Sequence, residues 1–238
     1  MRNLSILSGG AAQGLVRSLT PAFKAQTGFD ITGEFGAVGA MADRLRGGTP
    51  ADIVILTAAL VARLAGERRV LASSISDIGL VETALAVRAG DTQIAVRNAD
   101  DLRKLLLASD AIFVPDTRAS TAGIHVANVL DRLGIADEVA VRLRVFPNGA
   151  AAMRELAATD ARRPIGCTQS TEIISTEGVV LSGVLPPGCE LATMYTAGIT
   201  TQSVHSAQAV DLIGLLTGAA QSQQRQHAGF AGGSNQPR

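Results

Sequence analysis

Asn3-Leu-Ser-Ile-Leu-Ser-Gly-Gly-Ala-Ala-Gln-Gly-Leu15 stands near the start of the chain and decides its fold. The apolar run Leu4–Leu7 predicts a strand, and the small residues that follow it predict a loop. A strand that enters a helix through glycine and hydroxyl residues leaves unpaired backbone N–H groups at the helix start, and these groups attract anions. A helix over 15–26 is expected next, with an apolar face formed by Leu15, Val16, Leu19 and Phe23.

Strand and helix patterns alternate along the rest of the chain. The run Ala51-Asp-Ile-Val-Ile-Leu56, apolar except for Asp52, is typical of a parallel strand that is covered on both faces. This alternation predicts an α/β architecture with mostly parallel sheets. Further strands are expected at 31–35, 77–81, 83–87, 111–114, 141–146, 164–168, 179–184 and 191–199. Further helices are expected at 40–46, 58–65, 100–108, 122–133, 150–157 and 206–216.

Composition excludes several classes of function. Of 238 residues, 47% are hydrophobic, and 21 Lys+Arg balance 21 Asp+Glu, so the net charge favours neither nucleic acid nor a membrane surface. The chain has six Phe, one Tyr and no Trp, which argues against platforms for base stacking. No apolar run approaches the ~20 residues of a membrane span. We therefore expect no nucleic-acid partner and no membrane span.

The chain ends and the cysteines bear on the compartment. The first strand pattern begins so early that no export signal is expected, which predicts a cytoplasmic protein as given; a chain trimmed of its leader would look the same and be periplasmic. Cys167 and Cys189 are interpreted as two buried free thiols, since a disulfide would need an oxidising compartment. The three histidines show no metal-ligand spacing, so no metal site is expected. The Gln/Ser/Gly-rich tail 219–238 is expected to be partly disordered.

Small, neutral residues recur after most of the predicted strands. Because open α/β sheets bind ligands at the carboxyl ends of their strands, this recurrence favours an anion site built from backbone N–H groups and hydroxyls. For any single loop, ordinary turn and capping preferences explain the same residues. The candidates are Ser8, Gly9, Gly10, Ala37, Val38, Thr57, Ser120, Thr121, Asn148 and Gln169.

Asp116-Thr-Arg-Ala-Ser-Thr-Ala-Gly123 is the strongest single candidate loop. Ser120 or Thr121 can cap a helix that begins near Ala122, and a bound anion would lie on that helix end. Arg118 either clamps a carboxylate through two hydrogen bonds or faces solvent, and both interpretations stay open.

Titratable residues near these loops are weaker candidates. His125 is interpreted as a structural histidine rather than a proton acceptor. Glu82 and Glu172 are candidate general bases, although exposed positions on the surface are the favoured interpretation for both. The chain lacks the GxGxxG spacing, the Walker A motif and the GxSxG elbow, so no cofactor is predicted.

Three segments carry a resemblance to a known superfamily: Ser8-Gly-Gly-Ala-Ala, Phe23-Lys-Ala-Gln-Thr-Gly-Phe-Asp-Ile and Pro50-Ala-Asp-Ile-Val-Ile-Leu. With Val81-Glu-Thr-Ala-Leu-Ala-Val-Arg-Ala-Gly, they resemble the type II periplasmic binding proteins over about residues 4–218, and the molybdate-binding branch in particular. The members of that branch usually carry Tyr near the position of Gln169. The third-strand motif and Arg132-Leu-Gly-Ile-Ala-Asp also resemble aconitate isomerase-like members of the superfamily.

The resemblance implies two α/β lobes joined by two crossing strands that act as a hinge. Lobe I would hold residues 1–81 with 191–218, and lobe II residues 82–190. The resemblance implies a soluble binding protein that holds a molybdate-like oxyanion or a di- or tricarboxylate in the cleft between the lobes, against the candidate residues above. An ABC permease would be a partner only if the chain is exported. The alternative is an isomerase that moves an allylic proton on an aconitate-like tricarboxylate, with no base assigned.

Overall fold

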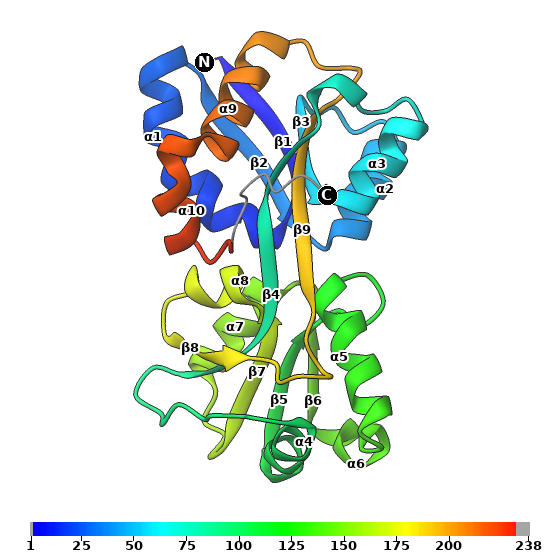
Figure 1. Cartoon of the computed structure of the whole chain (residues 1–238), viewed down its shortest axis with the longest axis vertical. Coiled ribbons are helices and arrows are strands. Elements are labelled where there is room, and N and C mark those ends of the chain that lie inside the picture. The colour runs from blue at the N-terminus through cyan, green and yellow to red at the C-terminus, as the bar shows by residue number, and fades with distance from the viewer. Residues whose placement is uncertain (1, 232–238) are drawn as a thin grey trace. The chain divides into compact units, whose positions relative to one another are not determined.

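The computed structural model describes residues 2–231, which form two α/β units. Unit 1 holds the chain up to Val81 and again from Thr193 onward, and unit 2 holds Glu82–Ala192. The alternation of strands and helices predicted from the sequence is confirmed (Figure 1). Parallel pairs are joined by antiparallel pairs that involve β4 and β9, so both sheets are mixed.

Unit 1 is built on strands in the order β2-β1-β3-β9-β4. Helices α1 and α9 pack together, and α2 and α3 lie together on the other side of the sheet (Figure 1). The strands are β1 Asn3–Gly9, β2 Asp30–Gly36, β3 Ile53–Thr57, β9 Ala192–Ile199 and the first part of β4 Ser76–Arg88. The helices are α1 Gln13–Thr27, α2 Val38–Arg46, α3 Ala58–Gly66, α9 Ser206–Thr217 and α10 Ser222–His227, with short 3-10 turns η1 Gly10–Ala12, η2 Ala72–Ser74 and η4 Ala219–Gln221.

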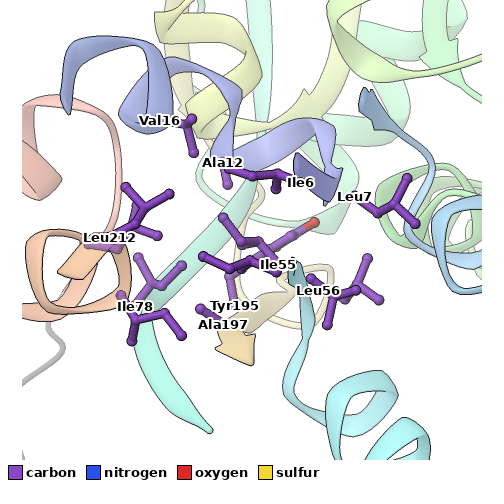
Figure 2. Close-up of a cluster of buried hydrophobic side chains, with 14 of the residues drawn as sticks. Ile6, Leu7, Ala12, Val16, Ile55, Leu56, Ile78, Tyr195, Ala197 and Leu212 are labelled. Carbon is purple, nitrogen blue, oxygen red and sulfur yellow. The ribbon is translucent and has the colours of Figure 1, made fainter. Parts of the chain in front are cut away.

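The core of unit 1 lies between the sheet and its helices. Side chains of β1, β3 and β9 gather there with Val16 of α1 and Leu212 of α9 (Figure 2). The predicted apolar face of the first helix is confirmed, because Leu15, Val16, Leu19 and Phe23 are all buried. Gly28 ends this helix in the left-handed region at φ 73°, where its N–H donates to the Lys24 carbonyl, and glycine meets no steric penalty there.

Unit 2 has strands in the order β4-β7-β5-β6, with β8 also paired to β4. Two buried clusters cover its sheet, one formed with α4, α5 and α6 and the other with α7. The strands are β5 Ala111–Pro115, β6 Leu143–Phe146, β7 Pro164–Gln169 and β8 Val179–Val184, with the second part of β4. The helices are α4 Ala99–Ala108, α5 Thr121–Arg132, α6 Ala136–Val139, α7 Gly149–Ala158 and α8 Ser170–Ile174, with the 3-10 turn η3 Ala140–Arg142.

One stretch differs from the sequence-based expectation. The two extended segments expected at 77–81 and 83–87 are a single strand, β4, which changes its pairing partners where the chain passes from unit 1 to unit 2. The first part of the Gln/Ser/Gly-rich tail, for which no disorder was specified, is folded. There Phe230 is buried, and the Arg225 guanidinium donates to the carbonyls of Leu216 (3.2 Å) and Gly218 (2.7 Å). The final residues 232–238, for which disorder was expected, lie outside the described residues.

Candidate functional site

In unit 1 the register brings the ends of three strands to one sheet edge. Gly9 at the end of β1 pairs with Gly36 at the end of β2, and Ser8 pairs with Ile55 of β3. The loops after these parallel strands therefore start side by side, as expected for the ligand-binding edge of an α/β sheet.

The helix starts at this edge differ in how they are capped. Gly9 precedes η1 and Ala37 precedes α2, and neither supplies a side-chain hydrogen bond to its helix. Thr57, in contrast, caps α3, because its Oγ1 accepts a hydrogen bond from the Leu60 amide (3.4 Å). The first amides of η1 and α2 are therefore free of any side-chain cap, whereas one amide of α3 is satisfied internally.

Gly9 also brings three elements of unit 1 together. A Cβ atom there would come within 2.7 Å of Val38 Cγ1 and 3.0 Å of Tyr195 Cε1, so only glycine allows β1, α2 and β9 to approach this closely. Ser8, beside it, is fully buried and donates its hydroxyl to the Gly9 carbonyl (2.9 Å). Ligand contacts by Ser8, Gly9, Gly10, Ala37 and Val38 stay predictions.

In unit 2 three parallel strands also end level with one another. Pro115 pairs with Phe146, and Phe113 pairs with Gly166. If these registers are continued, Asp116 lies level with Pro147 and Gln169. Asp116 and Pro147 are the first residues after β5 and β6, and Gln169 is the last residue of β7. The predicted residues of unit 2 thus gather around the start of α5, the start of α7 and the end of β7.

The loop before α5 is fixed by an aspartate. Asp116 Oδ1 accepts hydrogen bonds from the amides of Arg118 (2.7 Å) and Ala119 (2.9 Å), and these bonds lower the pKa of Asp116. The Arg118 side chain is exposed. Ser120 occupies the N-cap position of α5, and its side chain makes no capping hydrogen bond. The helix begins at Thr121, one residue before the expected start.

Sequence reasoning missed the role of Gly123 in this loop. A Cβ atom at Gly123 would overlap the carbonyl oxygens of Asp116 and Pro115, so glycine is needed for α5 to lie against the loop. No motif marks this position, since the overlap arises from a turn whose geometry the sequence does not show.

The first backbone amides of α7 already have hydrogen-bond partners within unit 2. Asn148 caps the helix, with its Oδ1 accepting from the Ala151 amide (2.8 Å). The carboxylate of Glu172 accepts hydrogen bonds from the backbone at Gly149 and Ala150, and from the Thr168 hydroxyl (2.6 Å). Because Asn148 uses its Oδ1 for the cap, its Nδ2 hydrogens stay available to a ligand.

The predicted exposed position of Glu172 is wrong. The residue is 4% exposed, and burial raises the pKa of its carboxyl group, although hydrogen bonds from Thr168 and from backbone amides oppose the rise. A Cβ atom at Gly149 would overlap Glu172 Oε2 and Thr168 Oγ1, so the glycine makes room for this buried carboxylate. Glu82, the other candidate base, is exposed as expected.

Gln169 ends β7 and lies at the N-cap position of α8. It is 3% exposed, and neither its Oε1 nor its Nε2 has a hydrogen-bond partner among the described residues. A buried amide with both polar atoms unpaired is costly, which makes Gln169 the most unusual of the predicted site residues.

The remaining titratable candidates are structural. His125 Nε2 lies 2.8 Å from the Cys189 carbonyl oxygen, which agrees with its interpretation as a structural histidine. Cys167 and Cys189 are free and buried, as predicted, and burial raises the pKa of the Cys167 thiol to about 12. Within residues 2–231, no group of three or more His, Cys, Asp or Glu side chains is arranged to hold a metal ion. None of the helices over this range is both long and apolar enough to cross a membrane.

A separate cavity of about 330 Å³ opens in unit 2 at the opposite end of β7. It is lined by residues that include Ile94, Leu105, Arg163 and Pro164. None of the predicted site residues lines this cavity, so it is distinct from the anion site predicted at the strand ends, which is called the strand-end site below.

The fold and these strand ends define the class of periplasmic-type solute-binding proteins. The chain belongs to the family described as bacterial extracellular solute-binding protein, whose model matches residues 4–231. The superfamily resemblance found in the sequence is thereby confirmed.

Solved structures and a curated relative agree with this assignment. The periplasmic molybdate-binding protein of Azotobacter vinelandii superposes with a TM-score of 0.81 at 17% identity, covering 97% of this chain and 100% of that one. The sulfate-binding protein SubI of Mycobacterium tuberculosis H37Rv gives a TM-score of 0.74 at 20% identity, covering 97% and 86%. An aconitate isomerase from Pseudomonas sp is 24% identical over 220 residues, which cover 88% of this chain and 80% of that protein.

Proposed function

We propose that this chain binds a small anion with several oxygen atoms, either a molybdate-like oxyanion or a di- or tricarboxylate. The observation that carries the proposal is the contrast between its helix starts. The N-termini of η1, α2 and α5 lack a side-chain cap. Small neutral residues precede η1 and α2, whereas the loop before α5 also carries Asp116 and Arg118. Uncapped amides at helix N-termini favour negative charge, both through their N–H groups and through the helix dipole.

The capped helix starts support the same proposal in another way. Thr57 and Asn148 accept a backbone hydrogen bond through an oxygen atom, which fixes each side chain. The Thr57 hydroxyl hydrogen and the Asn148 Nδ2 hydrogens are not used by these caps, so both residues are rigid donors toward an anion. The similar solved structures include a molybdate-binding protein and a sulfate-binding protein, which is consistent with such a ligand.

Thermal unfolding with a panel of molybdate, sulfate, citrate, cis-aconitate and trans-aconitate tests the proposal. A ligand at a hundredfold excess over its Kd stabilises the folded state by about 2.7 kcal/mol, which raises the melting temperature by several degrees. A panel in which no anion raises the melting temperature would contradict the proposal. Replacing Ser120 and Thr121 together by Ala should raise the Kd of the bound anion at least tenfold.

Asn148→Ala and Asn98→Ala form a matched pair. Asn98 caps α4 as Asn148 caps α7, with its Oδ1 accepting from the Asp101 amide (2.9 Å). Loss of either cap should lower the free energy of unfolding by about 1 kcal/mol. On the proposed function, only Asn148→Ala should also weaken anion binding, whereas equal affinities of the two variants would remove Asn148 from the binding residues.

A second candidate function is an isomerase acting on an aconitate-like tricarboxylate. The similarity to an aconitate isomerase favours it. Such a reaction needs a base near the substrate, and Glu172 is occupied by backbone amides and Thr168 while Glu82 is exposed. Incubation with cis-aconitate, followed by NMR, tests this candidate: appearance of the trans isomer identifies an enzyme, and an unchanged spectrum removes the isomerase.

A further inference from the structure

Three buried polar side chains of unit 2 lack hydrogen-bond partners among the described residues. They are Thr83 at its Oγ1, Gln169 at both Oε1 and Nε2, and Thr171 at its Oγ1. Their exposed fractions are 1%, 3% and 2%. Unpaired polar atoms are rare at this depth, because each forfeits its hydrogen bonds to water.

The register of the sheet places two of these side chains against each other. Thr83 of β4 is the direct antiparallel partner of Gln169 of β7. The Thr83 amide donates to the Leu191 carbonyl (2.9 Å), and its carbonyl accepts from the Leu185 amide (3.2 Å). Both backbone groups of Thr83 thus point away from β7, and the Thr83–Gln169 pair is of the non-hydrogen-bonded type, in which side chains on one face lie closest.

Polar groups next to this cluster are satisfied, so the lack of partners is local. Thr168 precedes Gln169 in β7, points to the other face and donates to Glu172 Oε2 (2.6 Å). Thr176, shortly after α8, donates its hydroxyl to the Glu172 carbonyl (2.7 Å). Thr171, the second residue of α8, has an unpaired hydroxyl. The three unpaired side chains therefore come from two paired positions of β4 and β7 and from the start of α8, which follows β7 directly.

The chemistry of the Gln169 amide specifies what could pair with it. Nε2 only donates hydrogen bonds and Oε1 only accepts them, whereas threonine hydroxyls do either. A fully deprotonated oxyanion offers acceptors alone and would leave Oε1 unpaired. A ligand that also carries an O–H group would satisfy both ends of the amide.

We propose that the ligand carries a hydrogen-bond donor beside its negative charge, as a hydroxy acid or a protonated oxyanion does, and that Gln169, with Thr83 and Thr171, selects it. This inference rests on the proposed function, since it specifies the class of anion that the strand-end site takes. Gln169 is then a specificity-determining residue. Buried polar groups of this kind reject an analogue that lacks the matching group, because they stay unpaired in its complex.

Calorimetric titration of the whole chain with matched anions tests the inference. The pairs are malate with succinate, citrate with tricarballylate, and phosphate with sulfate, and the second member of each lacks the O–H donor. We expect the donor-bearing member of the bound pair to have a Kd at least tenfold lower. Equal affinities within every pair, or binding of molybdate alone, would overturn the inference and leave the proposed function standing. Binding of no anion at all would overturn both.

The variant Gln169→Met separates recognition from a structural role. It keeps the side-chain length and removes both unpaired atoms, so we expect the melting temperature of the ligand-free protein to rise and the tenfold preference to disappear. Thr168→Val is the control, because it removes a hydroxyl that is already paired and should lower the melting temperature. If Gln169→Met lowers the melting temperature and keeps the preference, the amide is structural. Thr83→Val repeats the comparison from the neighbouring strand.

Discussion

Asp52 in unit 1 and Glu172 in unit 2 are both buried carboxylates that accept hydrogen bonds from backbone amides at the start of a helix. Asp52 precedes β3 and accepts from Ser5, Ser203 and the amides of Val204 and His205. Glu172 lies beyond the end of β7 and accepts from Gly149, Ala150 and Thr168. Burial raises the pKa of both groups, and the hydrogen bonds outweigh it only at Asp52, whose pKa is lowered.

The difference between the two pKa shifts matches the positions of the two carboxylates, which lie at opposite ends of strands in an α/β sheet. Asp52 directly precedes β3, at the opposite end of that strand from the proposed anion site, and its ionised form stabilises the fold. Glu172 lies in α8, just beyond the end of β7 and close to Gln169, and burial raises the pKa of its carboxyl group more than the hydrogen bonds lower it. The unfavourable burial of the Glu172 carboxylate is thus tolerated close to the proposed anion site. Locally unfavourable features of this kind concentrate at functional sites in proteins.

Asp52→Ala should give the largest effect on stability. The substitution leaves the Ser5 and Val204 amides and the Ser203 hydroxyl without their acceptor, so we expect the free energy of unfolding to fall by about 3 kcal/mol. Urea denaturation at neutral pH measures it. Asp43→Ala is the control, because that side chain is 75% exposed and its ion pair with Arg46 should contribute little. Similar losses in the two variants would contradict the structural role of Asp52.

Gly149→Ala should give the next largest effect, because the new methyl group would displace the Glu172 carboxylate and the Thr168 hydroxyl. Overpacking of this kind costs about 2 kcal/mol in the free energy of unfolding. Gly214→Ala in α9 is the matched control: a Cβ atom there meets open space, and Ala should stabilise the helix by roughly 0.5–1 kcal/mol. A gain of stability in both variants would mean that Glu172 does not need the glycine.

The sequence predicts unit 1 well because its signals are local. The run Ala51–Leu56 and the apolar face of Leu15 and Phe23 each depend on residues a few positions apart. The buried strand and the buried helix face are both confirmed, although β3 is parallel to β1 only and antiparallel to β9. The single strand β4 was missed, since no residue near Glu82 marks a strand that continues while its neighbours change. Strand patterns report local pleat and burial, not pairing partners.

The candidate site is predictable only in part. The strand-end loops could be named from their small residues, whereas the burial of Glu172 depends on Gly149 and Ala150, more than twenty residues earlier in the chain. A lone glutamate in a sequence is most often exposed, so the local signal favoured the wrong interpretation. The unpaired amide of Gln169 could not be predicted at all, because the lack of a partner is a property of the packed structure.

The pH dependence of stability gives the smallest and sharpest test of the comparison, with Asp52→Asn and Glu172→Gln as variants. At Asp52 the folded pKa lies below the ordinary 3.8, so its stabilisation is present above that pH and is lost as the pH falls through the folded value. At Glu172 the folded pKa lies above 4.5. The unfolded chain therefore releases its proton first, and stability falls as the pH rises from 4.5 toward the folded value. Each group changes the free energy of unfolding by at most about 1.4 kcal/mol per pH unit.

Urea denaturation from pH 3 upward should thus show Asp52→Asn losing stability relative to the natural chain as the pH rises, and Glu172→Gln gaining it. Parallel pH profiles for the two variants would show that the two carboxylates share one environment, and the distinction between the two strand ends would fail.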